Sequence, residues 1–386
     1  MKISIYALHL GFGGVEKYVT TVANMLADAH SVEIVSTYRI TPEPAFPVDP
    51  RVKITYLMGD LKPNKEEFKA AIRHKSIPGI FREGIRAAQV LLKRKKVNIQ
   101  SIKKCDSDVI ISTRIFHNAL IGKYAAPHTV KITGEHNHHN GNEKYINEVI
   151  SSCRSFNYFI PISKELCDFY REPMKENGVK TEYIRFCIDK NQELSPPEFD
   201  NFDVISVGRL SPEKGPLDLV RVFELITKKM PAARLHIVGD GEEYSNVQAL
   251  IKEKGLSDKV VLHGFRNKKY IYELLEKCSL YLMTSHTESF GLVLLEAMCC
   301  GVPCIAFDSA QGAHEIIENG KNGYLIENRS FDKMSETACR LLSDKDELCR
   351  LSRGALNTAD DFSYEKTKAA WLDLMNKIEE EKGCAK

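Results

Sequence analysis

Short apolar runs followed by amphipathic segments recur along this chain, and each pairing is typical of a strand that leads into a helix. The apolar run Lys2–Leu8 precedes the turn G-F-G-G and then a helix with one apolar face, Val15, Val19, Val22 and Leu26. Further runs of strand length come at 32–37, 53–57, 108–112, 129–133 and 156–161, and again at 203–207, 234–238, 260–262 and 280–283. This alternation predicts an α/β protein built on parallel sheets.

The strand-and-helix pattern restarts near residue 203, after a stretch with little periodicity that contains S-P-P. A chain of 386 residues is also longer than one hydrophobic core usually serves. We therefore expect two doubly wound Rossmann-like domains, at 1–187 and 203–363, joined by a linker at 188–202. The last segment, 364–386, holds the sole tryptophan, Trp371. It is expected to form a helix that packs back towards the N-terminal domain.

Composition narrows the class of protein. With 43% hydrophobic and 27% charged residues and a net charge of +2, the chain is not expected to bind nucleic acid. Its 11 cysteines are scattered and suit a reducing compartment rather than a disulfide frame or a zinc site. His9 and Gly11 interrupt the first apolar run too early for a signal peptide. A cytoplasmic protein is expected, with peripheral membrane contact at most.

The segment from Arg82 to Lys104 is strongly basic. Its only acid is Glu83, and its cations are Arg82, Arg86, Lys93, Arg94, Lys95, Lys96, Lys103 and Lys104. Because its apolar residues keep helical spacing, the segment is compatible with docking to an anionic membrane surface. An ordinary solvated helix face remains the alternative.

The glycine cluster Gly11–Gly14 could bring backbone N–H groups against a phosphate. A dinucleotide-binding fold would also need an acidic residue about 20 residues further on, at the end of the next strand. That strand ends in S-T-Y-R instead. A nicotinamide cofactor is therefore disfavoured.

A second phosphate-binding motif begins at Glu288, where the sequence reads E-S-F-G-L-V-L-L-E-A-M between an apolar run and a helix stop. A helix N-terminus offers free N–H groups to an anion. Here they would belong to Phe290, Gly291 and Leu292, while Glu296 could reach hydroxyls of the same ligand. An ordinary turn with two solvated glutamates is the alternative.

Two cations, Arg209 and Lys214, lie in the glycine-bounded loop G-R-L-S-P-E-K-G after the strand 203–207. They would converge with the Glu288 motif, because loops at the carboxyl ends of parallel strands meet at one edge. Together they could neutralise a departing diphosphate. Ordinary surface charges are the alternative.

Histidines gather in the loops after two other strands. We expect the loop G-E-H-N-H-H-N, with His136 and His138, to face a cleft, because so many polar groups are hard to satisfy in a core. A metal site there is possible but has no fixed ligand spacing. For His117 and His138 a structural role is favoured.

Five motifs together resemble the family 4 retaining glycosyltransferases with the GT-B fold: G-G-V-E-K, G-R-L-S-P-E-K-G, H-I-V-G-D-G, H-G-F and E-S-F-G-L-V-L-L-E-A-M. The resemblance covers nearly the whole chain and is strongest over Val204–Leu325. It implies two Rossmann-like domains that face a cleft. It also implies transfer of a sugar from a nucleotide donor with no metal and no further cofactor.

The resemblance also implies roles for individual residues. The catalytic set would be His136, Arg209, Lys214 and Glu288. The donor-binding set would be Gly14, Phe265, Arg266, Ser289, Phe290, Gly291, Leu292 and Glu296.

The function expected from all of these signals is a retaining hexosyltransferase. Its donor would be a nucleoside diphosphate sugar, with uridine as the base, and its acceptor a saccharide or a lipid-linked saccharide of a cell-surface or capsular polysaccharide. A sugar-nucleotide epimerase is one alternative. The other is a non-catalytic partner subunit that binds sugar on the same fold.

Overall fold

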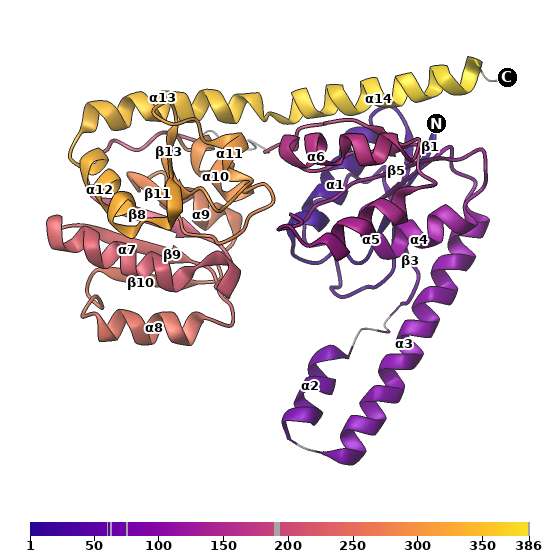
Figure 1. Cartoon of the computed structure of the whole chain (residues 1–386), viewed down its shortest axis with the longest axis horizontal. Helices are drawn as coiled ribbons and strands as arrows, with labels where there is room; N and C mark the ends of the chain where they lie inside the picture. Colours follow the sequence, from indigo (N-terminus) through magenta and orange to yellow (C-terminus); the bar gives the residue numbers. More distant parts are fainter. Residues whose placement is uncertain (60, 62–63, 75, 189–193, 385–386) are drawn as a thin grey trace. The chain divides into compact units, whose positions relative to one another are not determined.

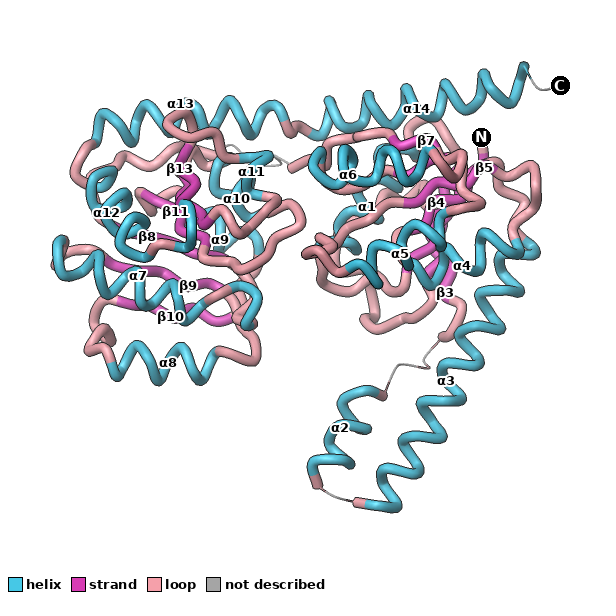
Figure 2. The backbone as a smooth tube through the Cα atoms, in the orientation of Figure 1, coloured by secondary structure: helices cyan, strands magenta, loops and turns pink. Residues whose placement is uncertain are grey.

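The computed structural model describes residues 1–59, 61, 64–74, 76–188 and 194–384. The chain divides into two compact units, which we describe separately. Unit 1 comprises Met1–Ile184 with Lys368–Lys386, and unit 2 comprises Arg185–Thr367. Each unit has a sheet covered by helices, as Figure 2 shows.

In the described part of unit 1, seven strands form a sheet in the order β3-β2-β1-β4-β5-β6-β7, with parallel pairing throughout. The strands are β1 (Lys2–Ala7), β2 (Ser31–Ser36), β3 (Lys53–Tyr56), β4 (Val109–Ser112), β5 (Val130–Thr133), β6 (Tyr158–Phe159) and β7 (Lys180–Thr181). The helices are α1 (Gly14–Leu26), α2 (Lys65–Arg73), α3 (Ile77–Lys104), α4 (Ile115–Tyr124), α5 (Glu143–Cys153), α6 (Lys164–Lys175) and most of α14 (Tyr364–Cys384).

The described part of unit 2 contains six strands in the order β10-β9-β8-β11-β12-β13, again all parallel. The strands are β8 (Asp203–Val207), β9 (Arg234–Val238), β10 (Val260–Gly264), β11 (Leu280–Met283), β12 (Cys304–Phe307) and β13 (Gly323–Ile326). The helices are η1 (Pro212–Lys214), α7 (Pro216–Lys229), α8 (Tyr244–Glu253), α9 (Lys268–Leu275), α10 (Leu292–Cys299), α11 (Ala313–Ile316), η2 (Glu327–Arg329), α12 (Phe331–Leu342) and α13 (Lys345–Asp361).

The predicted α/β class with two doubly wound, Rossmann-like sheets is confirmed. The inner strands β4, β11 and β12 contain no charged residue and are buried along their whole length, because parallel strands are covered on both faces. Strands β8, β9 and β11 have the predicted bounds. By contrast, β6 holds two residues where a longer strand was expected at 156–161.

The long helix α3 projects from unit 1 together with α2, and Figure 1 shows this helical hairpin extending away from the sheet. Ser76 caps the start of α3, because its hydroxyl accepts a hydrogen bond from the N–H of Gly79 at 3.3 Å. Within the described ranges, no helix is both long enough and apolar enough to cross a membrane.

Helix α14 packs onto unit 1 through both apolar and charged contacts. Trp371 is 1% exposed, and its ring centroid lies 6.4 Å from that of Tyr18. Nearer the chain end, Glu381 accepts hydrogen bonds from Lys180 at 2.7 Å and from the Tyr158 hydroxyl at 3.0 Å. Most of this helix therefore belongs to the core of unit 1.

Candidate active site

Two neighbouring strands of unit 2 bring the phosphate-binding loops to one edge of the sheet. β8 and β11 pair through Val204 with Leu280 and Ile205 with Tyr281. The Tyr281 hydroxyl donates to the carbonyl of Val207 at 2.9 Å and accepts from its N–H at 3.3 Å. The loops that follow β8 and β11 therefore start side by side, as the sequence predicted.

Lys214 and Glu288 form an ion pair across these two loops. The distance from Lys214 Nζ to Glu288 Oε2 is 2.5 Å, and the side chains are 29% and 17% exposed. An ammonium group has three N–H donors, so its bond to one carboxylate oxygen leaves donors for phosphate oxygens. The structure thus brings together the catalytic candidates of two separate motifs.

Arg209 is placed differently from Lys214. Its side chain is 70% exposed, and its Nη1 lies 4.0 Å from Glu213 Oε1. A hydrogen bond from Ser211 lowers the pKa of Glu213, with the charges of Arg209 and Lys214 adding to the effect. The described contacts therefore join Lys214, but not Arg209, to Glu288.

The turn between β11 and α10 is held tightly in place. Gly291 caps α10 in the left-handed region at a φ of 93°. The N–H of Gly312 donates to the carbonyl of Glu288 at 2.8 Å, and a Cβ on Gly312 would lie 2.3 Å from the backbone nitrogen of Phe290. Only glycine therefore fits at 312, and the predicted helix start at this turn is confirmed.

The remaining residues of this motif lie around the helix start. Phe290 is buried, and its ring packs 5.8 Å from that of Phe362. Ser289, Leu292 and Glu296 are half-buried, with Glu296 in the second turn of α10. Their contacts with a donor stay predictions.

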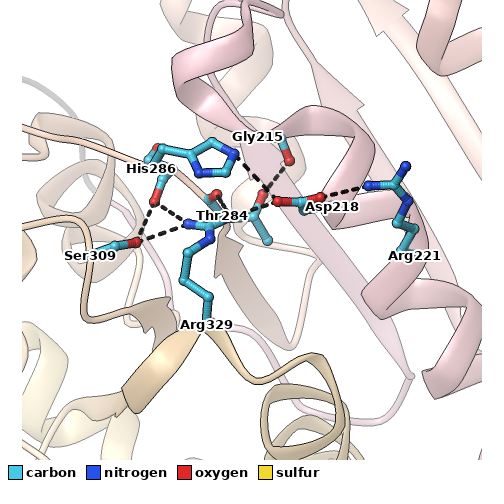
Figure 3. Close-up of polar contacts among 8 residues, drawn as sticks. Gly215, Asp218, Arg221, Thr284, His286, Ser309 and Arg329 are labelled. Atoms are coloured by element: carbon cyan, nitrogen blue, oxygen red, sulfur yellow. Dashed lines mark hydrogen bonds and ion pairs between the residues drawn. The ribbon is translucent and has the colours of Figure 1, made fainter.

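Arg329 links the loop after β11 to helix α7, as Figure 3 shows. Its guanidinium donates to Asp218 Oδ2 at 2.7 Å and to the carbonyls of Thr284 and Ser285 at 3.0 and 2.8 Å. A further bond reaches Ser309 Oγ at 2.9 Å. One planar fork of donors thus ties several backbone and side-chain groups together.

The carboxylate of Asp218 collects further partners (Figure 3). Arg221 lies 2.9 Å from its Oδ1, and His286 Nε2 lies 3.4 Å from its Oδ2. The Thr284 hydroxyl donates to the carbonyl of Gly215 at 2.9 Å, and a Cβ on Gly215 would meet the Thr284 carbonyl at 2.3 Å. These contacts fix the loop that carries Lys214 against the loop that leads to Glu288.

Sequence reasoning missed this network. Arg329 and its neighbour Asn328 have φ angles of 48° and 56°, a backbone region that non-glycine residues seldom adopt. Asn adopts this region more readily than most residues, but the sequence E-N-R does not predict it for Arg329 as well. Asp218 lies in the first turn of α7, where acidic residues are common, so nothing in the sequence singles it out.

The predicted base-binding residues follow β10. The strand ends at Gly264, whose φ is 66°, and the Phe265 side chain is 64% exposed. The guanidinium of Arg266 lies 5.1 Å from the centre of the Tyr270 ring, whose hydroxyl is hydrogen-bonded to His263 Nδ1 at 2.8 Å. An ordered aromatic surface is therefore present, and its contact with a base stays a prediction.

The glycine turn of unit 1 surrounds a buried acid. Glu16 is 5% exposed and lies 3.1 Å from Arg114 and 3.5 Å from His9. A Cβ on Gly13 would come 2.1 Å from Glu16 Oε2, whereas a Cβ on Gly14 would have open space. The close approach to Glu16 thus lies at Gly13, and no atom crowds Gly14.

His136 follows β5 and is kept neutral by its surroundings. Burial and the nearby Arg114 charge lower its pKa to about 3. Its ring packs edge-on against Tyr18 at 4.4 Å, and within the described residues its Nε2 has no hydrogen-bond partner. The backbone N–H of His136 donates to Glu135 Oε1 at 2.8 Å, which shapes the loop. His136 therefore holds an uncharged ring whose Nε2 is buried.

The other histidines have structural contacts. His117 is buried, with Nε2 3.0 Å from the Thr37 hydroxyl. His138 Nε2 lies 3.3 Å from Glu165, and its ring stacks on His139 at 4.5 Å. No three His, Cys, Asp or Glu side chains in the described part of the chain are arranged to hold a metal ion.

A family model covers most of the second unit. Residues 189–358 match the model described as "Glycosyl transferases group 1". The matched range contains Lys214, Glu288 and Arg329, and so includes both loops of the candidate site.

Two curated bacterial relatives align with the chain. The exopolysaccharide phosphotransferase SCO2592 of Streptomyces coelicolor is 25% identical over 95% of this chain and 39% of its own length. The poly(glycerol-phosphate) alpha-glucosyltransferase of Bacillus subtilis is 27% identical over 63% of this chain and 37% of its own length. The chain thus spans less than two thirds of either relative.

Solved structures share the fold. A mutant of TarM from Staphylococcus aureus, in complex with fondaparinux, alpha-GlcNAc-glycerol and UDP, matches with a TM-score of 0.77 and 17% identity. The match covers 97% of this chain and 100% of TarM. At this identity it supports the architecture alone, two Rossmann-like units of the GT-B type.

Proposed function

Because residues 189–358 carry a group 1 glycosyltransferase region, we propose that this protein moves a hexose from a uridine diphosphate sugar to a saccharide or lipid-linked saccharide acceptor. The reaction would serve bacterial cell-surface polysaccharide synthesis, such as a capsule, in the cytoplasm. The observation that carries the proposal is the Lys214–Glu288 pair beside the start of α10. A cation and a helix N-terminus suit a diphosphate, and a carboxylate suits sugar hydroxyls.

The proposed step exchanges one anomeric bond for another with retention. The bond from the anomeric carbon to the β-phosphate oxygen breaks, and a bond from that carbon to the acceptor oxygen forms on the same face. The acceptor proton passes to the departing phosphate oxygen. Lys214, Arg209 and the N–H groups of Phe290, Gly291 and Leu292 would stabilise the negative charge that develops there.

The other residues would bind and orient the donor. Glu288 would accept hydrogen bonds from the sugar hydroxyls, and Glu296 from the ribose. Phe265 and Arg266 would meet the base.

In unit 1, Gly14 would approach the phosphate. Neutral His136 would contact the donor sugar and help to order the acceptor, because an uncharged ring can accept a hydrogen bond. Metal independence is part of this proposal, since the cations named above would do the work of a metal ion.

The names of related proteins support this reading. The Bacillus relative is called an alpha-glucosyltransferase, and TarM was solved with UDP and a GlcNAc-glycerol. The basic segment Arg82–Lys104 favours the lipid-linked acceptor, because it would hold the enzyme near an anionic membrane.

A panel of nucleotide sugars tests the proposal through thermal stabilisation and slow donor hydrolysis. UDP and one UDP-sugar should raise the melting temperature of the wild type. Lys214→Ala should weaken UDP binding by about 10-fold to 100-fold, because it removes a charged hydrogen bond to phosphate. The matched control is Lys333→Ala, an exposed lysine elsewhere in unit 2. Unchanged UDP affinity in Lys214→Ala would overturn the site assignment.

Product analysis separates the alternatives. An epimerase would convert the donor sugar with no acceptor present. A non-catalytic partner subunit would bind sugar but release no UDP in the presence of any acceptor. Activity that disappears on chelation and returns with a divalent cation would contradict the metal-independent mechanism.

A further inference from the structure

The helical hairpin of unit 1 presents an apolar ridge to solvent. Along α3 the side chains of Ile77, Phe81, Ile85 and Leu92 are 79%, 73%, 49% and 71% exposed. Ala88, also exposed, lies between the last two. Single exposed apolar side chains are ordinary, but a continuous run along one projecting helix marks an interaction surface.

The ridge faces away from the side on which α3 packs. At about 100° per residue, its members fall within roughly 80° of the helix circumference. Val90 and Glu83, which are 3% and 5% exposed, fall on nearly the opposite side. Leu91, 52% exposed, widens the ridge. The hairpin is therefore packed along one side of α3 and apolar on the other.

Two cations lie within the span of the ridge, and the others follow it along the same helix. Exposed basic side chains on α3 are Arg82, Arg86, Lys93, Lys95, Lys96, Lys103 and Lys104. The one acid between Ile77 and Lys104 is Glu83, which lies 2.9 Å from Arg82 and 3.6 Å from Arg86. These pairs offset part of the positive charge beside the ridge, so most of the positive charge of α3 lies on the turns that follow Leu92.

Charge and apolarity together select the partner. A second copy of the hairpin would set cations against cations, which disfavours pairing of the two ridges. A free polyanion would match the cations but leave the ridge in water. An anionic bilayer satisfies both, because its headgroups meet the cations and its acyl boundary accepts the apolar side chains.

We propose that α3 lies on an anionic phospholipid surface, with the ridge Ile77–Leu92 buried at the boundary between headgroups and acyl chains. The hairpin alone carries this inference, which does not depend on sugar transfer. Bilayer binding should therefore persist in Lys214→Ala. If the protein transfers no sugar but still binds vesicles, the proposed function is wrong and the membrane proposal stands.

Vesicle flotation tests the binding. The 386-residue chain should float with phosphatidylcholine vesicles that contain phosphatidylglycerol, at low salt, and not with phosphatidylcholine alone. Replacing Phe81, Ile85 and Leu92 by Ser should lower the partition coefficient by about 30-fold or more. Replacing Lys93, Lys95 and Lys96 by Gln should lower it by about 100-fold. The control is Val261→Ser, which changes an apolar residue of unit 2 that is 42% exposed.

A tryptophan placed on the ridge reports its depth. The emission of the new tryptophan in Phe81→Trp is obtained by subtracting the wild-type spectrum. On vesicle binding, it should shift to the blue and be quenched by lipids brominated in the acyl chain. Gln100→Trp, an exposed position beyond the ridge on the same helix, should do neither. Equal vesicle binding by the wild type and the Ser triple variant would overturn the proposal. The proposal would also be overturned if the wild type formed a dimer and did not bind vesicles, and the Ser triple variant were monomeric.

Discussion

At the scale of single residues, His117 shows how burial in unit 1 links to pH. Its side chain is 0% exposed, and burial together with the charges of Arg94 and Arg114 lowers its pKa from 6.5 to about 3. The folded protein therefore keeps His117 neutral at pH values where the unfolded chain already binds a proton. The protein therefore has the full stability that neutral His117 allows above pH 6.5. It loses this stability as the pH falls from 6.5 towards 3, because the unfolded chain binds a proton at this histidine and the folded protein does not.

The free energy of unfolding should accordingly decrease below this pH, by up to about 1.4 kcal/mol per pH unit for one such histidine. His117→Gln should reduce that slope, because glutamine does not titrate. Urea unfolding at about pH 7, 6 and 5 measures it. His128→Gln, at an exposed histidine of the same unit, is the control. Equal slopes for the wild type and His117→Gln would contradict the assignment.

The residue types of the candidate site were predictable from the sequence, but their pairing was not. Lys214 and Arg209 looked equivalent, since both follow β8 in one loop. In the structure Lys214 contacts Glu288 at 2.5 Å, whereas Arg209 is 70% exposed. The difference arises from η1 and from the left-handed φ of 61° at Gly215, which turn the end of the loop towards β11.

At the scale of elements, the Arg329 network determines how two loops of unit 2 meet. Arg329→Ala would leave Asp218 with fewer partners and the carbonyls of Thr284 and Ser285 without these donors. Such losses cost about 1–3 kcal/mol each when buried. Because the loops carry Lys214 and Glu288, the apparent Kd for UDP should also rise.

Three variants give this prediction its controls. Arg329→Lys should recover only part of the loss, since one ammonium cannot replace a planar fork. Arg353→Ala removes an exposed arginine of the same unit and should leave both stability and UDP affinity unchanged. Chemical unfolding and UDP titration measure the two effects. A destabilised Arg329→Ala with wild-type UDP affinity would restrict the network to a stabilising role.

Some strands were predicted with their bounds, and others were missed. β8, β9 and β11 matched residue for residue because charges or turn signals border each run. β12 and β13 were not predicted, although they have the same length of four residues as β11. Arg329 was missed with them, because its position follows from the end of β13.

At the scale of the whole molecule, each unit has a core of its own, and this predicts separable unfolding. The only tryptophan, Trp371, is buried in unit 1, so its emission reports on that unit. Calorimetry should show two transitions. UDP at about 100 times its Kd should stabilise the transition of unit 2 by about 2.7 kcal/mol.

Tryptophan fluorescence should follow the transition that UDP leaves unchanged. Lys214→Ala provides the control, because at the same UDP concentration its 10-fold to 100-fold weaker affinity should reduce the stabilisation of unit 2 to about 1.4 to 0.4 kcal/mol. A single transition, seen by both methods and raised as a whole by UDP, would contradict independent unfolding.

The exposed ridge of α3 also has a consequence for the behaviour of the purified protein. Mutual repulsion of the surrounding cations keeps the ridges of different molecules apart, and it acts over about 10 Å at 0.1 M salt but only about 3 Å at 1 M. High salt concentration should therefore promote self-association of the protein through the ridge, whereas low salt should keep it monomeric. Light scattering of stock solutions across a salt series would display this colloidal behaviour, and detergent below its micellar concentration should suppress it.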